Sequence, residues 1–592
     1  MLYDFIHEPR TAYFSMEIAL KSEIPTYSGG LGMLAGDTLR SAADLELPLV
    51  GVTLVSRAGY LRQELDAQGR QTERPVSWEP RDYAQSLDAK VALPIEGRAV
   101  WVGAWLYVLE GHGAGRVPVI LLDTDLDENR DADRAITHHL YGGDETYRFK
   151  QEIVLGIGGA RMLNALGFQV RHYHMNEGHS ALLGVELLHR YAYPVWDRRS
   201  GEPAYDIPRV RDLCSFTTHT PVETRHDCFG YDLVGRVLGN FIGVEGLARL
   251  ADAAAARRSR LTVNEALIEL DTLKQLAGAD ALNMTRLALN LSEYVNGVAK
   301  RHAEVSRVLF PGYEVHSVTN GVHPSTWAAP VFAELYDRHL PAWRHEPEQL
   351  VRVDCCIPDA SILEAHAKAK QELIEKVRAL TGIALHPKVP ILGFARRMTA
   401  YKRPDLLFTD LDRLKAIARE RSFQVVLAGK AHPRDEPGKR LIEELHAKAR
   451  ALAGTIAVAY LPDYDMAIAQ ALVAGADVWL NTPLPPLEAS GTSGMKAAFN
   501  GVPSLSVLDG WWIEGCIEGV TGWAIGDGRG APETDARALY DKLEQVVLPL
   551  YYGYGHEPGG WVRVMKGAIS KNASYFNSHR MMRRYVTEAY IR

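Results

Sequence analysis

Short apolar runs alternate with amphipathic, helix-like stretches over most of this chain. Strand-like runs cover residues 117–122 and 213–217, and between them a helical pattern over residues 151–166 stops at Gly167. Glycine commonly follows the last residue of a helix, because it adopts the left-handed conformation without strain. This alternation predicts an α/β fold with parallel sheets.

The alternation restarts in the second half, after a stretch near residues 340–358 that prolines interrupt. An apolar stripe predicts a helix that begins at Ser361 and ends at Gly382. Further strand-like and helix-like segments follow at residues 389–394, 423–428, 439–452, 455–461 and 476–480. Residues 573–591 are helical and rich in aromatic side chains, so we expect them to pack back across the first domain.

A chain of 592 residues is too long for a single core, so we expect at least two domains. We predict an N-terminal domain over residues 1–345, a C-terminal domain over residues 346–572 and a returning helix over residues 573–592. The composition, with 47% hydrophobic and 23% charged residues, is typical of a soluble globular protein. The net charge of −7 argues against nucleic-acid binding, because phosphate backbones require clustered lysine and arginine.

The cysteines and the apolar runs bear on where the protein resides. The five cysteines are scattered and form no CxxC pair, which favours a reducing compartment over a disulfide framework. The first residues lack the basic region and apolar core of a secretory signal. No apolar stretch reaches the ~18 residues expected of a membrane helix. We therefore expect a cytoplasmic protein without a membrane or nucleic-acid partner.

Lys496 ends a loop of glycine and hydroxyl residues at positions 488–495, between a strand-like run and a short helix predicted over residues 496–501. Backbone N–H groups of such a loop suit a phosphate, although the P-loop pattern GxxxxGK[ST] does not match. A lysine in this place can form a Schiff base with a phosphorylated aldehyde cofactor. A solvated lysine in a turn is the usual case for a lone lysine, so the hypothesis depends on other motifs.

A glycine loop near residue 30 and a histidine at residue 219 add two further candidates. Gly30-x-Gly32-x-x-Ala35 formally matches a dinucleotide fingerprint, but Pro25 interrupts any strand before it. The loop predicts an anionic group at a helix N-terminus, with a plain helix-entry turn as an equal alternative. His219 lies where a strand-like run breaks, a position that faces the ligand crevice in open α/β sheets. By itself, a buried structural histidine is the commoner case.

Two clusters of polar residues are the remaining candidates for a functional site. Residues 172–179 contain several residues of metal-ligand type, but their spacing matches no zinc signature, so we predict no metal. Residues 396–403 carry four cations directly after a strand-like run. Arginine forks and lysine point charges at a strand's carboxyl end suit phosphate oxygens. A solvated basic loop is the alternative, and we favour phosphate.

Taken together, these motifs resemble the α-glucan phosphorylases, the family of glycogen, starch and maltodextrin phosphorylases. The blocks occur in the family's order from residues 13–17 to residues 508–510. Residues 488–496 are similar to the family's EASGTxxMK cofactor motif, which implies that Lys496 binds pyridoxal 5'-phosphate. The resemblance also implies a GT-B glycosyltransferase architecture, in which two Rossmann-like domains face each other across a cleft.

The resemblance implies a role for each matching position. His219 is similar to the histidine that contacts the reacting sugar, and Arg397 and Lys402 match the cations that bind the substrate phosphate, with Tyr401 beside them. The family's glycine loop, which supports that phosphate, corresponds to Gly29, Gly30, Leu31 and Gly32. The sugar contacts implied are Asn176, Glu177, His179, Asn320, Glu488, Ala489, Ser490 and Gly491, with aspartate in the family at position 177.

The cofactor site is implied in the same way, with one departure from the family. The residues implied around Lys496 are Arg396, Thr492, Ser493, Gly494, Tyr13 and Trp327. Arg396 lies where the family often has a lysine. Asp465 falls where better-known members have an arginine on the cofactor phosphate. An aspartate cannot take that role, so another cation must compensate or the cofactor is held less tightly.

The activity implied is reversible phosphorolysis of α-1,4-glucans from the non-reducing end, giving α-D-glucose 1-phosphate with retention. The cofactor phosphate assists proton transfer, and we find no convincing pair of catalytic carboxylates. The alternatives are a nucleotide-sugar-dependent glucan synthase-type glycosyltransferase and an inactive glucan-binding descendant; Asp465 alone favours the second. The chain is shorter than the animal enzymes, so allosteric control through their N-terminal extension is not expected. The sequence leaves open whether the chain forms a homodimer.

Overall fold

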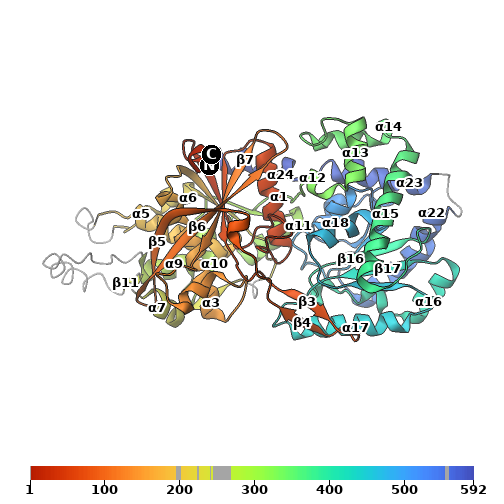
Figure 1. The fold of residues 1–592 in the computed structure, drawn as a ribbon, viewed down its shortest axis with the longest axis horizontal. Helices are drawn as coiled ribbons and strands as arrows, with labels where there is room; N and C mark the ends of the chain where they lie inside the picture. Colours follow the sequence, from red (N-terminus) through yellow and green to blue (C-terminus); the bar gives the residue numbers. More distant parts are fainter. Residues whose placement is uncertain are drawn as a thin grey trace.

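The computed structural model describes residues 2–194, 202–222, 226–239, 242–243, 268–553 and 559–591. Its first half is built on a nine-stranded sheet, at the left of Figure 1. The strands from β15 to β7 pair in parallel, whereas β7, β6 and β5 pair antiparallel. The order is β15 (His316–Ser317), β14 (Tyr294–Gly297), β9 (Cys214–Thr217), β8 (Val170–Asn176), β1 (Arg10–Ser15), β2 (Leu49–Leu54), β7 (Arg116–Asp123), β6 (Arg98–Glu110) and β5 (Gln85–Ile95).

Helices of the first half follow the predicted pattern closely. The predicted helix over residues 151–166 is part of a longer one: α3 (Glu145–Ile153), a π-helical turn over residues 154–158 and α4 (Gly159–Ala165). Gly167 follows with a φ of 84°, the left-handed conformation expected of a helix stop. The glycine loop leads into α1 (Gly30–Asp44), and a coil rather than a strand precedes it.

The second half is built on a six-stranded sheet in which every pair is parallel. Its order is β18 (Val458–Leu461), β17 (Gln424–Ala428), β16 (Ile391–Ala395), β19 (Val478–Asn481), β20 (Ser504–Val507) and β21 (Gly522–Ile525). The helix predicted from Ser361 begins two residues earlier, as α15 (Asp359–Thr381), and Gly382 ends it with a φ of 73°. The chain is therefore a mixed α/β protein with two large, mostly parallel sheets.

The helix that carries Lys496 differs from its prediction. We predicted a helix over residues 496–501, but α19 spans Ser493–Ala498, so Lys496 lies inside the helix rather than at the end of a loop. Packing decides the boundary: Trp479 Nε1 donates to Ser493 Oγ at 3.0 Å. A Cβ on Gly494 would come within 2.7 Å of the Trp511 ring, so only glycine fits this first turn.

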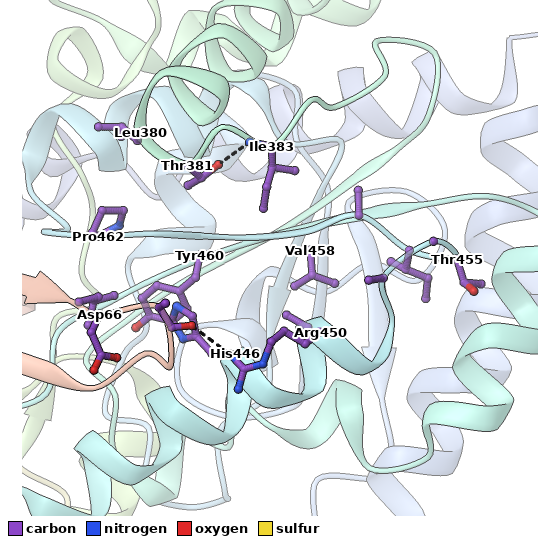
Figure 2. A pocket seen from close by; sticks show the side chains of 17 residues that line it. Asp66, Leu380, Thr381, Ile383, His446, Arg450, Thr455, Val458, Tyr460 and Pro462 are labelled. Atoms are coloured by element: carbon purple, nitrogen blue, oxygen red, sulfur yellow. Dashed lines mark hydrogen bonds between the residues drawn. The ribbon is translucent and has the colours of Figure 1, made fainter.

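Two segments join the halves. The hairpin of β3 (Arg62–Leu65) and β4 (Gln71–Arg74) extends onto the second half, beside α17 (Glu436–Ala451) in Figure 1. Gln63 Nε2 donates to the Gly429 carbonyl at 3.0 Å, and Gln71 Nε2 donates to the Ala431 carbonyl at 2.9 Å. A cavity of about 800 Å³ lies next to the hairpin tip, and none of the predicted site residues lines it. Figure 2 shows the side chains that line this cavity.

The residues predicted as a returning helix over 573–592 form a shorter one. A turn and a bend occupy residues 574–576, and α24 (Ser578–Tyr585) begins where the Asn577 side chain accepts a hydrogen bond from the Arg580 N–H at 2.8 Å. A π-helical turn over residues 586–590 continues it. Tyr590 bonds to His174 of β8 at 2.6 Å, and Asn296 of β14 donates to the Tyr585 hydroxyl at 3.1 Å. This segment therefore packs on the first sheet.

Hydrophobic side chains of residues 327–343 pack into the same core as the helices of the second half. These residues include α12 (Pro324–Trp327) and α13 (Pro330–His339), which come before the predicted boundary at residues 345–346. Among the described residues, every helix is too short or too polar to cross a bilayer.

Candidate active site

The basic loop after β16 binds a buried carboxylate. Arg396 Nη2 lies 2.8 Å and Lys402 Nζ 2.7 Å from the same oxygen, Glu488 Oε2. Burial would raise the pKa of Glu488, but the two cations outweigh it and lower that pKa. Arg396 also donates to Asn481, at the end of β19. Two cations thus share one carboxylate, which leaves an excess positive charge suited to an anion.

The other two cations of the loop point elsewhere. Arg403, with a φ of 45°, donates to two backbone carbonyls and to Asp535 at 2.7 Å, so it holds the loop in place. Arg397 is exposed, and its Nη2 donates to Ser28 Oγ at 3.4 Å. A Cβ on Gly29 would lie 3.5 Å from the same Nη2. The basic loop of the second half therefore meets the glycine loop of the first.

Glu17 fixes the glycine loop, a role that our sequence predictions did not include. Its Oε2 accepts the N–H groups of Ser28 at 2.5 Å and Gly29 at 3.1 Å, and Tyr141 donates to its Oε1 at 2.9 Å. A Cβ on Gly32 would lie 2.7 Å from Oε2, so this position requires glycine. The only sequence signal was its place in the 13–17 block.

The first turn of α1 leaves N–H groups available beside Arg397. Since Gly29 is the N-cap residue, the N–H groups of Gly30, Leu31 and Gly32 have no partner within the helix. No side chain caps them, and they have no hydrogen-bond partner elsewhere in the part of the chain that the structure describes. Unpaired N–H groups at a helix start, next to a guanidinium, favour a bound anion.

His219 is held in one orientation from two sides. Its Nε2 lies 2.7 Å from Asn176 Oδ1, and because Asn176 Nδ2 donates to Ser15, Nε2 is the donor. Its backbone N–H donates to Glu177 Oε2 at 2.9 Å. Burial lowers the pKa of His219 to about 4, so the ring is neutral at physiological pH. The arrangement presents a neutral imidazole with a fixed tautomer.

Glu177, which we predicted as a sugar contact, is hydrogen-bonded to backbone N–H groups. It is buried, its φ is 72°, and its oxygens accept the N–H groups of Gly178 and His219. A glutamate in the left-handed region is strained and persists only where its surroundings fix it. His179 Nε2 lies 3.3 Å from Asp227 Oδ2, in an ion-pair network with Arg148. Both side chains therefore bond to protein groups in this structure.

Two predicted sugar contacts have buried oxygens without a partner. Asn320 is 2% exposed, and Ser490 is 5% exposed. Within the described parts of the chain, neither Asn320 Oδ1 nor Ser490 Oγ has a hydrogen-bond partner. Buried polar atoms are nearly always paired, so such atoms indicate where a polar ligand binds. Arg580 of α24 fixes the first of them, since its Nη2 donates to the Asn320 carbonyl at 3.0 Å.

Lys496 is 7% exposed and has no hydrogen-bond partner among the residues described. Its Nζ lies 3.9 Å from the centroid of the Trp327 ring. Burial lowers its pKa from 10.5 to about 8, so a reactive neutral amine is accessible near physiological pH. Trp327 in turn donates from Nε1 to Asp37 Oδ2 at 2.8 Å. Asp37 was not predicted, because it is remote in sequence from both partners.

The remaining predicted cofactor residues lie as follows. Thr492 is the N-cap residue of α19, with Ser493 and Gly494 in its first turn. Tyr13 lies on β1 of the first sheet and is buried, with its ring centroid 5.0 Å from that of His174. Asp465 Oδ1 accepts the Ile468 N–H at 2.8 Å and so caps α18 (Met466–Gly475). The aspartate at the family's arginine position therefore serves a helix N-terminus.

Comparison with known proteins matches the chain to the family model described as carbohydrate phosphorylase over residues 162–521. A maltodextrin phosphorylase of Thermococcus litoralis is 38% identical, in an alignment that covers 98% of this chain and 70% of the relative. A glycogen phosphorylase of Aquifex aeolicus is 35% identical, over 99% of this chain and 87% of the relative. A glycogen phosphorylase of Mycobacterium tuberculosis is 36% identical, over 98% and 70% respectively.

Proposed function

This chain belongs to the carbohydrate phosphorylase family, and from that premise we propose that it catalyses reversible phosphorolysis of α-1,4-glucans. The products are α-D-glucose 1-phosphate, with retained configuration, and a glucan shortened at its non-reducing end. The observation that carries the proposal is the meeting of Arg397 with the glycine loop, because it brings the basic loop of the second half to N–H groups that have no partner among the described residues.

The proposed architecture is GT-B, with two Rossmann-like domains over residues 1–345 and 346–572 facing each other across a cleft. The two large, mostly parallel sheets support this division. Arg397 and Lys402 follow β16, whereas His219 follows β9, so both sets lie at the carboxyl ends of parallel strands. Ligands of α/β proteins bind at such ends. Closure of the domains would exclude water, which would otherwise convert phosphorolysis into hydrolysis.

The residues around Lys496 fit pyridoxal 5'-phosphate. A buried lysine with a lowered pKa can bind the aldehyde, and Asp37 Oδ1 and Ser490 Oγ are buried atoms without a hydrogen-bond partner in the described chain. Thr492, Ser493 and Gly494 would hold the phosphate at the start of α19, with Arg396 as the cation. When bound, the cofactor supplies a phosphate that exchanges a proton with the substrate phosphate.

The protein's own groups have two roles: they bind the substrate phosphate and they orient the reacting sugar. Arg397, Lys402 and the N–H groups of Gly30 and Gly32 bind the substrate phosphate and lower the repulsion between two neighbouring phosphates. The substrate phosphate delivers its proton to the glycosidic oxygen. His219, fixed by Asn176 with its proton on Nε2, orients the reacting sugar as a neutral acceptor through Nδ1.

The test is to incubate purified protein with phosphate and maltooligosaccharides and to assay glucose 1-phosphate, then to repeat the assay with Lys496→Ala. We expect product from the wild type and none from the variant. Lys566→Ala is the matched control, because Lys566 is also buried but pairs with Asp359 at 2.5 Å, away from the site. Free glucose as the main product would overturn the proposal.

Reduction of the linkage between Lys496 and the cofactor separates this proposal from carbonyl chemistry. If the lysine only anchors the cofactor, reduced protein keeps substantial activity. Complete loss of activity after reduction, with the protein still folded, would contradict the assigned role of Lys496.

A further inference from the structure

Asp37 presents a buried carboxylate of which only one oxygen is hydrogen-bonded. It lies in the middle of α1 and is 1% exposed. Its Oδ2 accepts the Trp327 indole N–H at 2.8 Å, whereas Oδ1 has no hydrogen-bond partner within the described residues. Arg40 Nη1 forms an ion pair with Oδ1 at 3.6 Å, a distance beyond hydrogen-bond length. Arg40 Nη2 is already bonded to the carbonyls of Ala19 and Leu20, at 2.9 and 2.6 Å.

The same carboxylate lies within electrostatic reach of the cofactor lysine. The Trp327 ring connects the two groups: Lys496 Nζ is 3.9 Å from its centroid, and Asp37 binds its Nε1 edge. Burial lowers the pKa of Lys496, and Asp37 is the largest influence in the opposite direction. The unbonded oxygen therefore belongs to the pocket that surrounds Lys496.

A buried carboxylate oxygen without a hydrogen bond costs about 1–3 kcal/mol, so it is expected to persist where a ligand completes it. The polar groups of pyridoxal phosphate are its phosphate, its ring hydroxyl oxygen and its ring nitrogen. The phosphate is anionic, and the ring oxygen is an acceptor once ionised. Only the ring nitrogen, when protonated, can offer a positively charged N–H to a carboxylate.

We propose that Asp37 binds the cofactor, with Oδ1 accepting a hydrogen bond from the protonated ring nitrogen of pyridoxal phosphate. The proposal rests on the proposed function, since it requires that Lys496 holds this cofactor. Such a contact joins two opposite charges in a buried place, which makes it a strong hydrogen bond. It also adds binding energy to a site in which Asp465, the residue at the family's arginine position, caps a helix instead.

The test uses the holoenzyme loaded with cofactor labelled with ¹⁵N at the ring nitrogen. In the wild type we expect a protonated nitrogen in the ¹⁵N spectrum that stays protonated as the pH rises through neutrality. In Asp37→Asn the nitrogen should be neutral over the same range. Equilibrium dialysis should show weaker cofactor binding, by about ten- to a hundredfold, the equivalent of ~1.5–3 kcal/mol for a charged hydrogen bond.

Asp44→Asn is the matched control, because Asp44 is a buried aspartate of the same helix that pairs with His323 at 2.8 Å. We expect it to leave the ring nitrogen protonated. A neutral ring nitrogen in the wild type would overturn the proposal, even if Asp37→Asn did not fold, as would an unchanged spectrum in a folded Asp37→Asn. Wild-type protein that binds no pyridoxal phosphate would instead overturn the proposed function itself.

Discussion

The candidate site consists of two groups that use their carboxylates differently. In the first-sheet group (residues 28–32, Asn176, His219 and Asn320), the carboxylates of Glu17 and Glu177 accept backbone N–H groups and thereby fix loops. In the second-sheet group (Arg396, Arg397, Lys402, Glu488 and Lys496), Glu488 pairs with two cations. The first group therefore contributes shape and neutral donors, whereas the second contributes charge.

The two groups also differ in the pH range over which a key side chain of each changes its protonation state. Burial lowers the pKa of His219 to about 4, which keeps the first-sheet group neutral, and it lowers the pKa of Lys496 to about 8. The first-sheet group therefore titrates on the acid side of neutrality and the second-sheet group on the alkaline side. The variants below test this division.

Glu488→Gln should have the largest effect, because it leaves Arg396 and Lys402 buried without a counter-charge. We expect the free energy of unfolding to fall by about 3–5 kcal/mol. Activity should fall by on the order of 10²-fold, as when an electrostatic catalytic contact is lost. Inorganic phosphate should restore part of the stability, since it binds the same cations. Urea unfolding with and without phosphate, together with initial rates, measures these effects.

Glu177→Gln provides the contrast to that variant. It weakens contacts to backbone N–H groups and unpairs no cation in the first-sheet group, so added phosphate should restore nothing. Equal rescue of both variants by phosphate would remove the distinction between the groups.

Lys496→Met should stabilise the protein without cofactor at neutral pH. The pKa of Lys496 is 10.5 in the unfolded chain and about 8 in the folded one, so the unfolded state binds more protons between these values. Stability therefore rises with pH over that window, and below it the wild type bears the full cost of burying the charge. The variant should be more stable by about 3 kcal/mol at pH 7 and show no difference above pH ~10.5. The measurement is urea unfolding of both cofactor-free proteins at the two pH values. A difference in the free energy of unfolding that does not depend on pH would contradict the prediction.

His219→Gln should flatten the stability profile on the acid side. The pKa of His219 falls from 6.5 in the unfolded chain to about 4 in the folded one, so its contribution is complete above pH 6.5 and lost as the pH falls towards 4. We expect a difference of about 1–2 kcal/mol between the profiles, because the side chain keeps some contact with solvent. Thermal unfolding of both proteins across this range is the measurement, and parallel profiles would show that the ring does not titrate there.

Substitutions of Asp465 should give the smallest change in stability. Asp465 is an exception to the division between the two groups. It lies in the second half, yet its carboxylate accepts a backbone N–H in the manner of Glu17. Asp465→Ala should lose about 1 kcal/mol of stability through the lost cap, whereas Asp465→Asn should stay within about 0.5 kcal/mol of the wild type. Equal losses in both variants, measured by urea unfolding, would show that charge rather than capping holds this helix.

The sequence was sufficient for elements whose signals are local. The apolar stripe and Gly382 predicted α15 to within two residues at its start. Family motifs predicted the meeting of distant blocks, such as the basic loop and the glycine loop. The start of α19 was missed because Gly491, Ser493 and Gly494 are typical of a loop. Contacts to Trp479 and Trp511, which no local pattern contains, extend the helix to Ser493.

Other parts of the site depend on contacts that sequence spacing does not reveal. Asp37 reaches Trp327 across 290 positions, and Arg580 reaches the Asn320 carbonyl across 260. The hydrogen bonds that Glu177 accepts from Gly178 and His219 were not predicted, because they depend on its positive φ. Motifs thus indicate which residues meet, whereas the hydrogen-bond partner of each carboxylate is decided by packing.

The packing of residues 578–590 on the first sheet has a consequence for biosynthesis. A ribosome makes β8 and β14 hundreds of residues before it makes α24, which supplies Tyr585 and Tyr590 to them. Until translation passes residue 590, the polar atoms of His174 and Asn296 lack these partners and the surface beneath them is uncovered. The first sheet therefore cannot finish folding as an independent unit during synthesis, unlike domains that fold in order as they emerge. The Asn320 carbonyl likewise gains its contact with Arg580 of α24 only at this late stage.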